Sequence, residues 1–201
     1  MEAQARQART RRMLVITAVA VFVVVLVVIV AVASRSKDSK KPQAVTGAPD
    51  PNVTCTADTK FDPGSTHVSA PTYTVDPPAG GDHLDTPSAP GIYDVGKVPT
   101  DGHIVHSMEH GYIVIWQRPD VSDATRTKTE NVYKNHPRDI LLVERASLPA
   151  ATPVVATAWH HRLLCSGADE FQLEQFVQQY NNQGPELIPH NVLPAGRNPK
   201  T

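Results

Sequence analysis

The block His106-Ser107-Met108-Glu109-His110-Gly111 holds the side chains of this chain that are best suited to chemistry. Two imidazoles and a carboxylate fall within five residues, and these groups are the usual protein ligands of zinc and copper. His83 and His103 lie within the same 28 positions as His106 and His110. The cluster predicts either a metal or catalytic site, or a buried polar network whose members satisfy each other.

The chemistry of this block depends on its secondary structure. On a helix, His106 and His110 share a face, and the string matches the inverted zincin pattern H-x-x-E-H. On a strand, His106, Met108 and His110 share a face while Glu109 points away, and two imidazoles with a thioether suit copper. Because Gly111 and a β-branched run follow the block, we expect a strand or a tight turn rather than a helix.

His83 follows a Pro-Gly turn, whose rigid backbone would present it as a third ligand. The predicted metal ligands are therefore His83, His106, His110 and Glu109, with Met108 as a further candidate, and the predicted ion is copper or zinc. No side chain is predicted to be catalytic on its own.

Three functions fit this cluster. The first is a metal-binding or accessory binding module without turnover. The second is a metal-dependent hydrolase in which Glu109 acts as general base. The third is a structural subunit of a membrane complex, with the histidines as internal scaffolding.

Residues 13–33 form a run of 21 residues in which only Thr17 is polar. A helix of that length spans the ~30 Å hydrocarbon core of a bilayer. We therefore expect one transmembrane helix that contacts membrane lipid. It divides the chain into a cytoplasmic tail, the helix, a polar stalk, one folded domain and a polar tail, at residues 1–12, 13–33, 34–50, 51–190 and 191–201.

Basic residues flank the apolar run on both sides, so charge alone does not set its orientation. The short N-terminal tail and the location of both cysteines in the C-terminal part favour a signal-anchor with an extracytoplasmic domain. Ala31-Val32-Ala33 resembles a signal-peptidase site, which leaves cleavage before Ser34 as an alternative; the run is long for a signal peptide. Either alternative exports the domain, which could there contact another membrane or exported protein.

Cys55 and Cys165 are the two cysteines of the chain. An even count in an exported domain predicts one disulfide, with Cα atoms about 4.4–6.8 Å apart. The net charge of −1 argues against a nucleic-acid partner.

The pattern of the domain predicts an α+β fold, with a β-sheet and a C-terminal helix that covers one sheet face. Three apolar, β-branched runs predict strands at 112–116, 140–143 and 154–159. Two segments predict helices, at 122–134 and 169–180, the second from an apolar stripe at Leu173, Phe176, Val177 and Tyr180. Ser166 with Asp169 resembles a capping box, and Gly184-Pro185 would end this helix. Residues 70–102 are rich in Pro and Gly and predict a long loop.

Five short motifs occur in a fixed order and resemble a known family. They are Pro77-Pro78-Ala79-Gly80-Gly81-Asp82-His83, Gly91-Ile92-Tyr93, His106-Ser107-Met108-Glu109-His110-Gly111, Ala158-Trp159 and Gly184-Pro185-Glu186. The region of about residues 70–187 is similar to the uncharacterised bacterial DUF3105 family, whose most specific motif is HS-[LM]-EHG. Ala79-Gly80 stands where that family usually has Thr-Ser. The resemblance implies an N-terminally anchored, exported domain and no established activity.

Overall fold

The computed structural model describes residues 46–190, which belong to the second of two compact units, residues 44–201. The predicted transmembrane helix at 13–33, the cytoplasmic tail, and the C-terminal tail at 191–201 lie outside the described residues. Within residues 46–190, no helix combines the length and the apolar character that crossing a bilayer requires.

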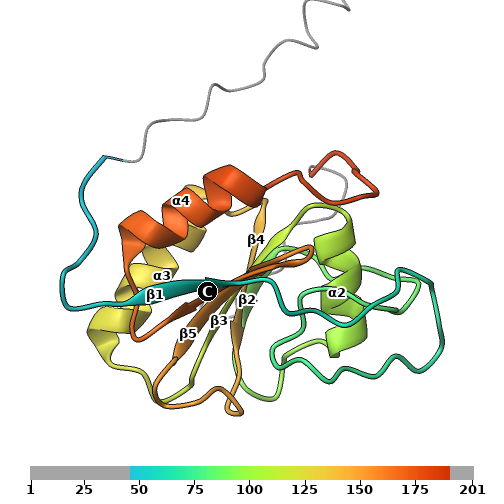
Figure 1. Cartoon of the computed structure of the whole chain (residues 1–201), viewed down its shortest axis with the longest axis horizontal. Helices are drawn as coiled ribbons and strands as arrows, with labels where there is room; N and C mark the ends of the chain where they lie inside the picture. The colour runs from blue at the N-terminus through green and yellow to red at the C-terminus, as the bar shows by residue number, and fades with distance from the viewer. Residues whose placement is uncertain (1–45, 191–201) are drawn as a thin grey trace, which may run out of the picture. The chain divides into compact units, whose positions relative to one another are not determined.

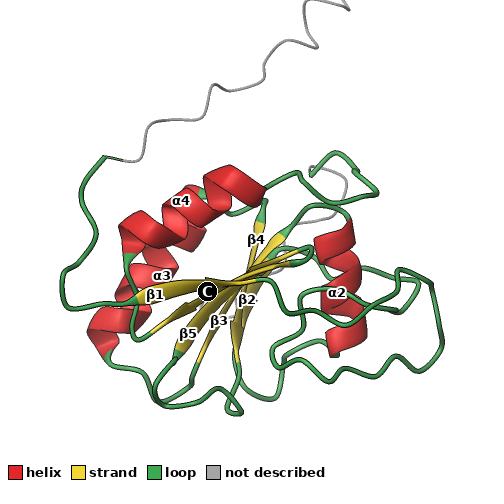
Figure 2. Ribbon diagram, in the orientation of Figure 1, coloured by secondary structure: helices red, strands yellow, loops and turns green. Residues whose placement is uncertain are grey.

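Six strands and three helices form within the described part of the chain (Figures 1 and 2). In chain order they are β1 (Cys55–Asp58), β2 (Gly91–Tyr93), α2 (Asp101–Glu109), β3 (Ile113–Gln117), α3 (Asp123–Asn135), β4 (Ile140–Glu144), β5 (Val154–Ala158), β6 (His161–Cys165) and α4 (Glu170–Tyr180).

The strands make one mixed sheet in the order β1-β6-β5-β3-β4-β2. β2, β4 and β3 are parallel, and α3 is the crossover between β3 and β4. β5, β6 and β1 extend the sheet in antiparallel pairings. The parallel half is therefore the part of the sheet that carries the helical connections.

Each face of the sheet builds its own core, because side chains alternate along a strand. Ile113, Ile115 and Leu142 belong to the core under α3 and α4. Val114 and Trp116, on the alternate positions of β3, belong to a second core that includes residues of α2. Figure 2 shows α3 and α4 together, well separated from α2. The second core is the one beneath the histidine block.

The α+β prediction is confirmed, and five elements lie within a residue or two of the predicted positions. These are β3, β4, β5, α3 and α4. Three further strands, β1, β2 and β6, were not predicted as such, and β2 lies inside the predicted loop at 70–102. Their side chains are partly exposed or their runs are short, so the local pattern is weak.

The predicted range of the last helix is confirmed, but its predicted cap needs correction. Asp169 itself is the N-cap, and its Oδ1 accepts a hydrogen bond from the backbone N–H of Gln172 at 3.2 Å. Ser166 instead bonds to the backbone of Thr54. The helix ends at Tyr180 as predicted, and the proposed stop signal Gly184-Pro185 lies four residues further along the chain. A capping carboxylate, rather than a Ser-based capping box, thus starts α4.

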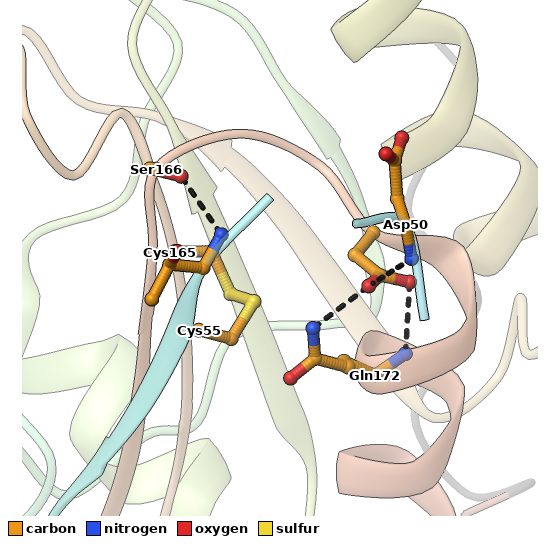
Figure 3. Close-up of a disulfide and its surroundings, with 7 residues drawn as sticks. Asp50, Cys55, Cys165, Ser166 and Gln172 are labelled. Atoms are coloured by element: carbon orange, nitrogen blue, oxygen red, sulfur yellow. Dashed lines mark hydrogen bonds between the residues drawn. A yellow bond between two sulfur atoms is a disulfide. The ribbon is translucent and has the colours of Figure 1, made fainter. Parts of the chain in front are cut away.

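The predicted disulfide joins Cys55 and Cys165, which face each other across the antiparallel pair of β1 and β6 (Figure 3). Their Cα atoms are 4.1 Å apart, slightly closer than the predicted range. The bridge lies beside the core under α3 and α4. It ties the first strand of the domain to the last one.

The block around His106 forms a helix, and the prediction of a strand or turn was wrong. α2 runs from Asp101 to Glu109, and seven of its nine residues are buried. Gly111, with φ of 88°, directly follows the C-cap residue His110. A glycine in this conformation commonly ends a helix, so Gly111 marks the end of α2 rather than its absence.

Candidate metal centre

α2 divides its side chains between the core and the cluster. Ile104, Val105 and Met108 are fully buried in the core that α2 shares with the sheet. His106, Glu109 and His110 follow at the i, i+3 and i+4 spacing that places side chains on one helix face. The helix therefore sets the thioether of Met108 apart from the two imidazoles, and the strand geometry that made Met108 a candidate ligand does not occur.

A loop before β2 supplies two more imidazoles. The backbone of His83 pairs with the segment around His67: the N–H of Val68 donates to the carbonyl of His83 at 2.8 Å, and the N–H of His83 donates to the carbonyl of Thr66 at 3.0 Å. The Tyr73 hydroxyl closes the same loop by donating to the carbonyl of Asp82 at 2.7 Å. This backbone ladder places His67 beside His83 although sixteen positions separate them.

Four residues converge at this point: His67, His83, His106 and Glu109. One ligand atom from each lies within 4.8 Å of every other. The Oε2 atom of Glu109 is 2.8 Å from the Nε2 of His83 and 3.9 Å from the Nε2 of His67. The spacing is close to that of the ligand shell of one transition-metal ion, with bonds of about 2.0–2.2 Å.

Backbone carbonyls fix the tautomers of the buried imidazoles. The Nδ1 of His83 lies 2.9 Å from the carbonyl oxygen of Gly81, and that of His106 lies 2.7 Å from the carbonyl oxygen of Leu84. The Nδ1 of His110 contacts the carbonyl oxygen of Glu186. A carbonyl oxygen only accepts, so each Nδ1 carries the hydrogen and each neutral ring presents a lone pair at Nε2. Metal-ligating histidines are commonly oriented in this way.

Burial favours the neutral form of His106. Its side chain is almost completely removed from water, and this desolvation lowers the pKa of His106 to about 4. Neighbouring His110, His83 and His67 lower it further, because positive charges would repel each other. At neutral pH, His106 therefore offers the uncharged imidazole that a metal requires.

His110 contacts His106 but lies outside the four-residue group. Its Nε2 is 2.8 Å from the Nε2 of His106. Two lone pairs that face each other at this distance repel, and a proton or a metal ion beside them relieves the repulsion. Of the predicted ligands, His83, His106 and Glu109 are thus brought together, with His110 next to them.

His67 is the member of the group that the sequence did not reveal. It lies sixteen residues before His83, with no recognisable motif around it, and only the loop ladder brings it to α2. His103, in contrast, turns away from the group, and its Nδ1 bonds to the carbonyl oxygen of Thr86 at 2.5 Å. Position along the chain was therefore a poor guide to which histidines converge.

The helical geometry satisfies one requirement of the inverted zincin pattern but not its division of roles. In that pattern the two histidines bind the ion and the glutamate acts as base. Here the carboxylate of Glu109 lies in the ligand group and His110 lies outside it. Glu186, from the Gly184-Pro185-Glu186 motif, contributes its backbone carbonyl to His110.

The fold and the site define a class of protein: a small α+β domain with a buried His/Glu cluster between a helix and a loop. The chain belongs to the DUF3105 family, described as a protein of unknown function, whose pattern matches residues 66–191. No curated protein and no solved structure shows a significant match to the chain. The matched segment includes every residue of the cluster.

Proposed function

We propose that this protein is a membrane-anchored, extracytoplasmic domain that binds a divalent transition metal. The ligands are His67, His83, His106 and Glu109, and His110 lies beside them as a neighbouring imidazole. Binding, without turnover of a substrate, is the function that these side chains support best.

One observation carries this proposal. The Nε2 of His83 and the Oε2 of Glu109 are buried and lie 2.8 Å apart, at ion-pair distance, yet neither atom has a hydrogen bond of normal geometry within the described residues. An unsatisfied buried polar atom costs about 1–3 kcal/mol, and more where it is charged. A divalent cation bound by both atoms would satisfy them together while His83 stays neutral.

The donor atoms favour zinc or copper in the divalent state. The group offers three imidazole nitrogens and one carboxylate oxygen. Imidazole suits zinc and copper, and four such donors complete the tetrahedral shell of a zinc ion. Since Met108 is in the core, the group lacks the sulfur ligand that monovalent copper prefers.

The proposed location is supported by the apolar run at 13–33 and by the disulfide between Cys55 and Cys165. Disulfides persist in oxidising compartments outside the cytoplasm. An uncleaved anchor predicts that the mature protein retains Met1 and that protease added to intact cells removes the domain. A mature chain beginning at Ser34 would show that the run is a cleaved signal peptide.

Metal content is the direct test of binding. The full chain, purified in a mild detergent without a histidine tag, should contain about one zinc or copper ion per molecule by elemental analysis. The variant His83→Ala/His106→Ala should contain none, since it removes two imidazoles that backbone carbonyls orient.

His103→Ala is the matched control, because His103 lies on the same helix but outside the ligand group. It should bind metal like the wild-type chain. If the double variant retains full metal content, or if the wild-type chain takes up no zinc or copper on titration, the histidines form a structural network and the proposal is wrong.

A further inference from the structure

The four proposed ligands are unequally shielded from water. Nearly half of the His67 side chain is exposed, at 47%, whereas the side chains of His83 and Glu109 are 0% and 3% exposed. His106 is similarly buried. A metal ion in this site would thus be enclosed by three ligands and reach solvent on the side of the fourth.

The exposed ligand is also the one with the fewest neighbours that fix its position. His83 and His106 are each held at Nδ1 by a backbone carbonyl, and Glu109 extends from a buried helix. The backbone of His67 is tied to His83, but its ring meets the group at its outer edge, with centroids 4.9 Å from His83 and 4.7 Å from His106. Rotation of this one side chain opens a coordination position without disturbing the core.

The charge of the occupied site favours an anion at that position. A divalent cation with one carboxylate and neutral imidazoles keeps a net charge of +1. An uncompensated charge in a buried site is unfavourable, and an anionic ligand would neutralise it where the neutral His67 does not. Zinc sites that act on other molecules likewise keep one position for an exogenous ligand.

We propose that the His67 position is exchangeable, and that a small monoanion can displace this imidazole from the bound metal. This inference rests on the proposed metal site and adds its ligand class. The buried residues His83, His106 and Glu109 retain the ion while the fourth position accepts the anion. The step is a ligand substitution: the metal–nitrogen bond to His67 breaks and a metal–anion bond forms.

The test uses the full chain loaded with cobalt(II), whose visible absorption reports its coordination, and sodium azide as the anion. Cobalt uptake is measured first, in the wild-type chain, in His67→Gln and in His103→Gln. Azide is then titrated into each cobalt-loaded protein at constant ionic strength, with sodium perchlorate as the salt control.

Azide should change the cobalt spectrum of the wild-type chain, and it should bind to His67→Gln at least about tenfold more tightly. The reason is that a tethered imidazole competes with azide at an effective concentration of the order of millimolar. His103→Gln should match the wild-type chain, because its ring lies outside the ligand group.

Four results would overturn the inference. If His67→Gln takes up no cobalt, His67 is an indispensable ligand rather than an exchangeable one. If cobalt binds but azide leaves every spectrum unchanged, or binds the wild-type chain and His67→Gln equally, the anion does not compete with His67. Absence of cobalt from the wild-type chain would overturn the proposed metal site as well, which separates the two failures.

Discussion

At the scale of single residues, the cluster is organised by hydrogen bonds to the main chain. His83, His106 and His110 each direct Nδ1 at a carbonyl oxygen and Nε2 at another member of the cluster. Because a carbonyl oxygen cannot donate, these contacts select one tautomer for each neutral ring. The protein has thus fixed the orientation of the nitrogen lone pairs before any ion is bound.

The buried, uncharged state of His106 predicts a loss of stability in acid. The unfolded chain has an ordinary histidine pKa near 6.5, whereas the native pKa is about 4, so below pH 6.5 the unfolded state binds the proton more readily. The free energy of unfolding of the metal-free chain should therefore fall between pH 6.5 and pH 4. The contribution of His106 is at most about 3 kcal/mol.

Urea denaturation of the metal-free protein across this pH range measures the effect. His106→Gln, which does not titrate, should show a shallower decrease than the wild-type chain. His103→Gln should show the wild-type decrease. A variant His106→Gln with an unchanged pH dependence would mean that His106 is not desolvated in the native state.

At the scale of elements, α2 is a helix that is buried on nearly all sides. One side contacts the sheet through Ile104, Val105 and Met108, and the other contacts the loop that carries His67 and His83. Gly102 contributes to this close packing, because a Cβ atom there would meet Leu84 and Pro71 at less than 3 Å. The tertiary environment, more than local propensity, stabilises this short helix.

Substitution of Met108 separates its role in the core from a role in metal binding. Met108→Ala should lower the free energy of unfolding by about 2–5 kcal/mol, because it leaves a cavity between α2 and the sheet. Met108→Leu keeps the volume and should cost less than about 1.5 kcal/mol.

Chemical denaturation and zinc titration of both variants provide the measurement. Met108→Leu should bind metal with wild-type affinity, since no thioether is needed. A clear loss of metal affinity in Met108→Leu, with its stability preserved, would instead make the sulfur a ligand.

At the scale of the whole molecule, the disulfide and the histidine cluster lie beside different cores of the sheet. The disulfide lies beside the core under α3 and α4, and the cluster lies over the core that includes α2. The four cluster residues lie on α2 and on the loop before β2, and none of them belongs to β1 or β6, which carry the disulfide. Stability and metal binding should therefore respond separately to loss of the bridge.

The variant Cys55→Ala/Cys165→Ala should lower the free energy of unfolding by about 3–5 kcal/mol, because the bridge closes a loop of 110 residues. Where this variant remains folded, its affinity for zinc should stay within about threefold of the wild-type value. Thermal denaturation and zinc titration at low temperature test both parts. A large loss of affinity in the folded variant would show that the bridge also positions the metal ligands.

The local pattern determined the elements whose side chains follow a clear period. The strands β3, β4 and β5 are continuous apolar runs, and α4 has an apolar stripe that includes Leu173 and Phe176. The disulfide followed from an even count of cysteines in a domain that the sequence predicts to be exported. The family resemblance followed from the order of short motifs, above all the block from His106 to Gly111. Each of these inferences needs only neighbouring residues or a count of residues.

Only the tertiary structure decided the conformation of that block and the membership of the cluster. α2 is buried on several sides, so its sequence has no amphipathic period. Gly111, which in the sequence argues against a helix, instead ends this one. His67 joins the ligand group through a backbone pairing with His83. Met108 is not part of the group, because residues two apart on a helix, such as His106 and Met108, point to different sides. Convergence of side chains from a loop and a helix depends on how those elements pack, and spacing along the chain does not contain that information.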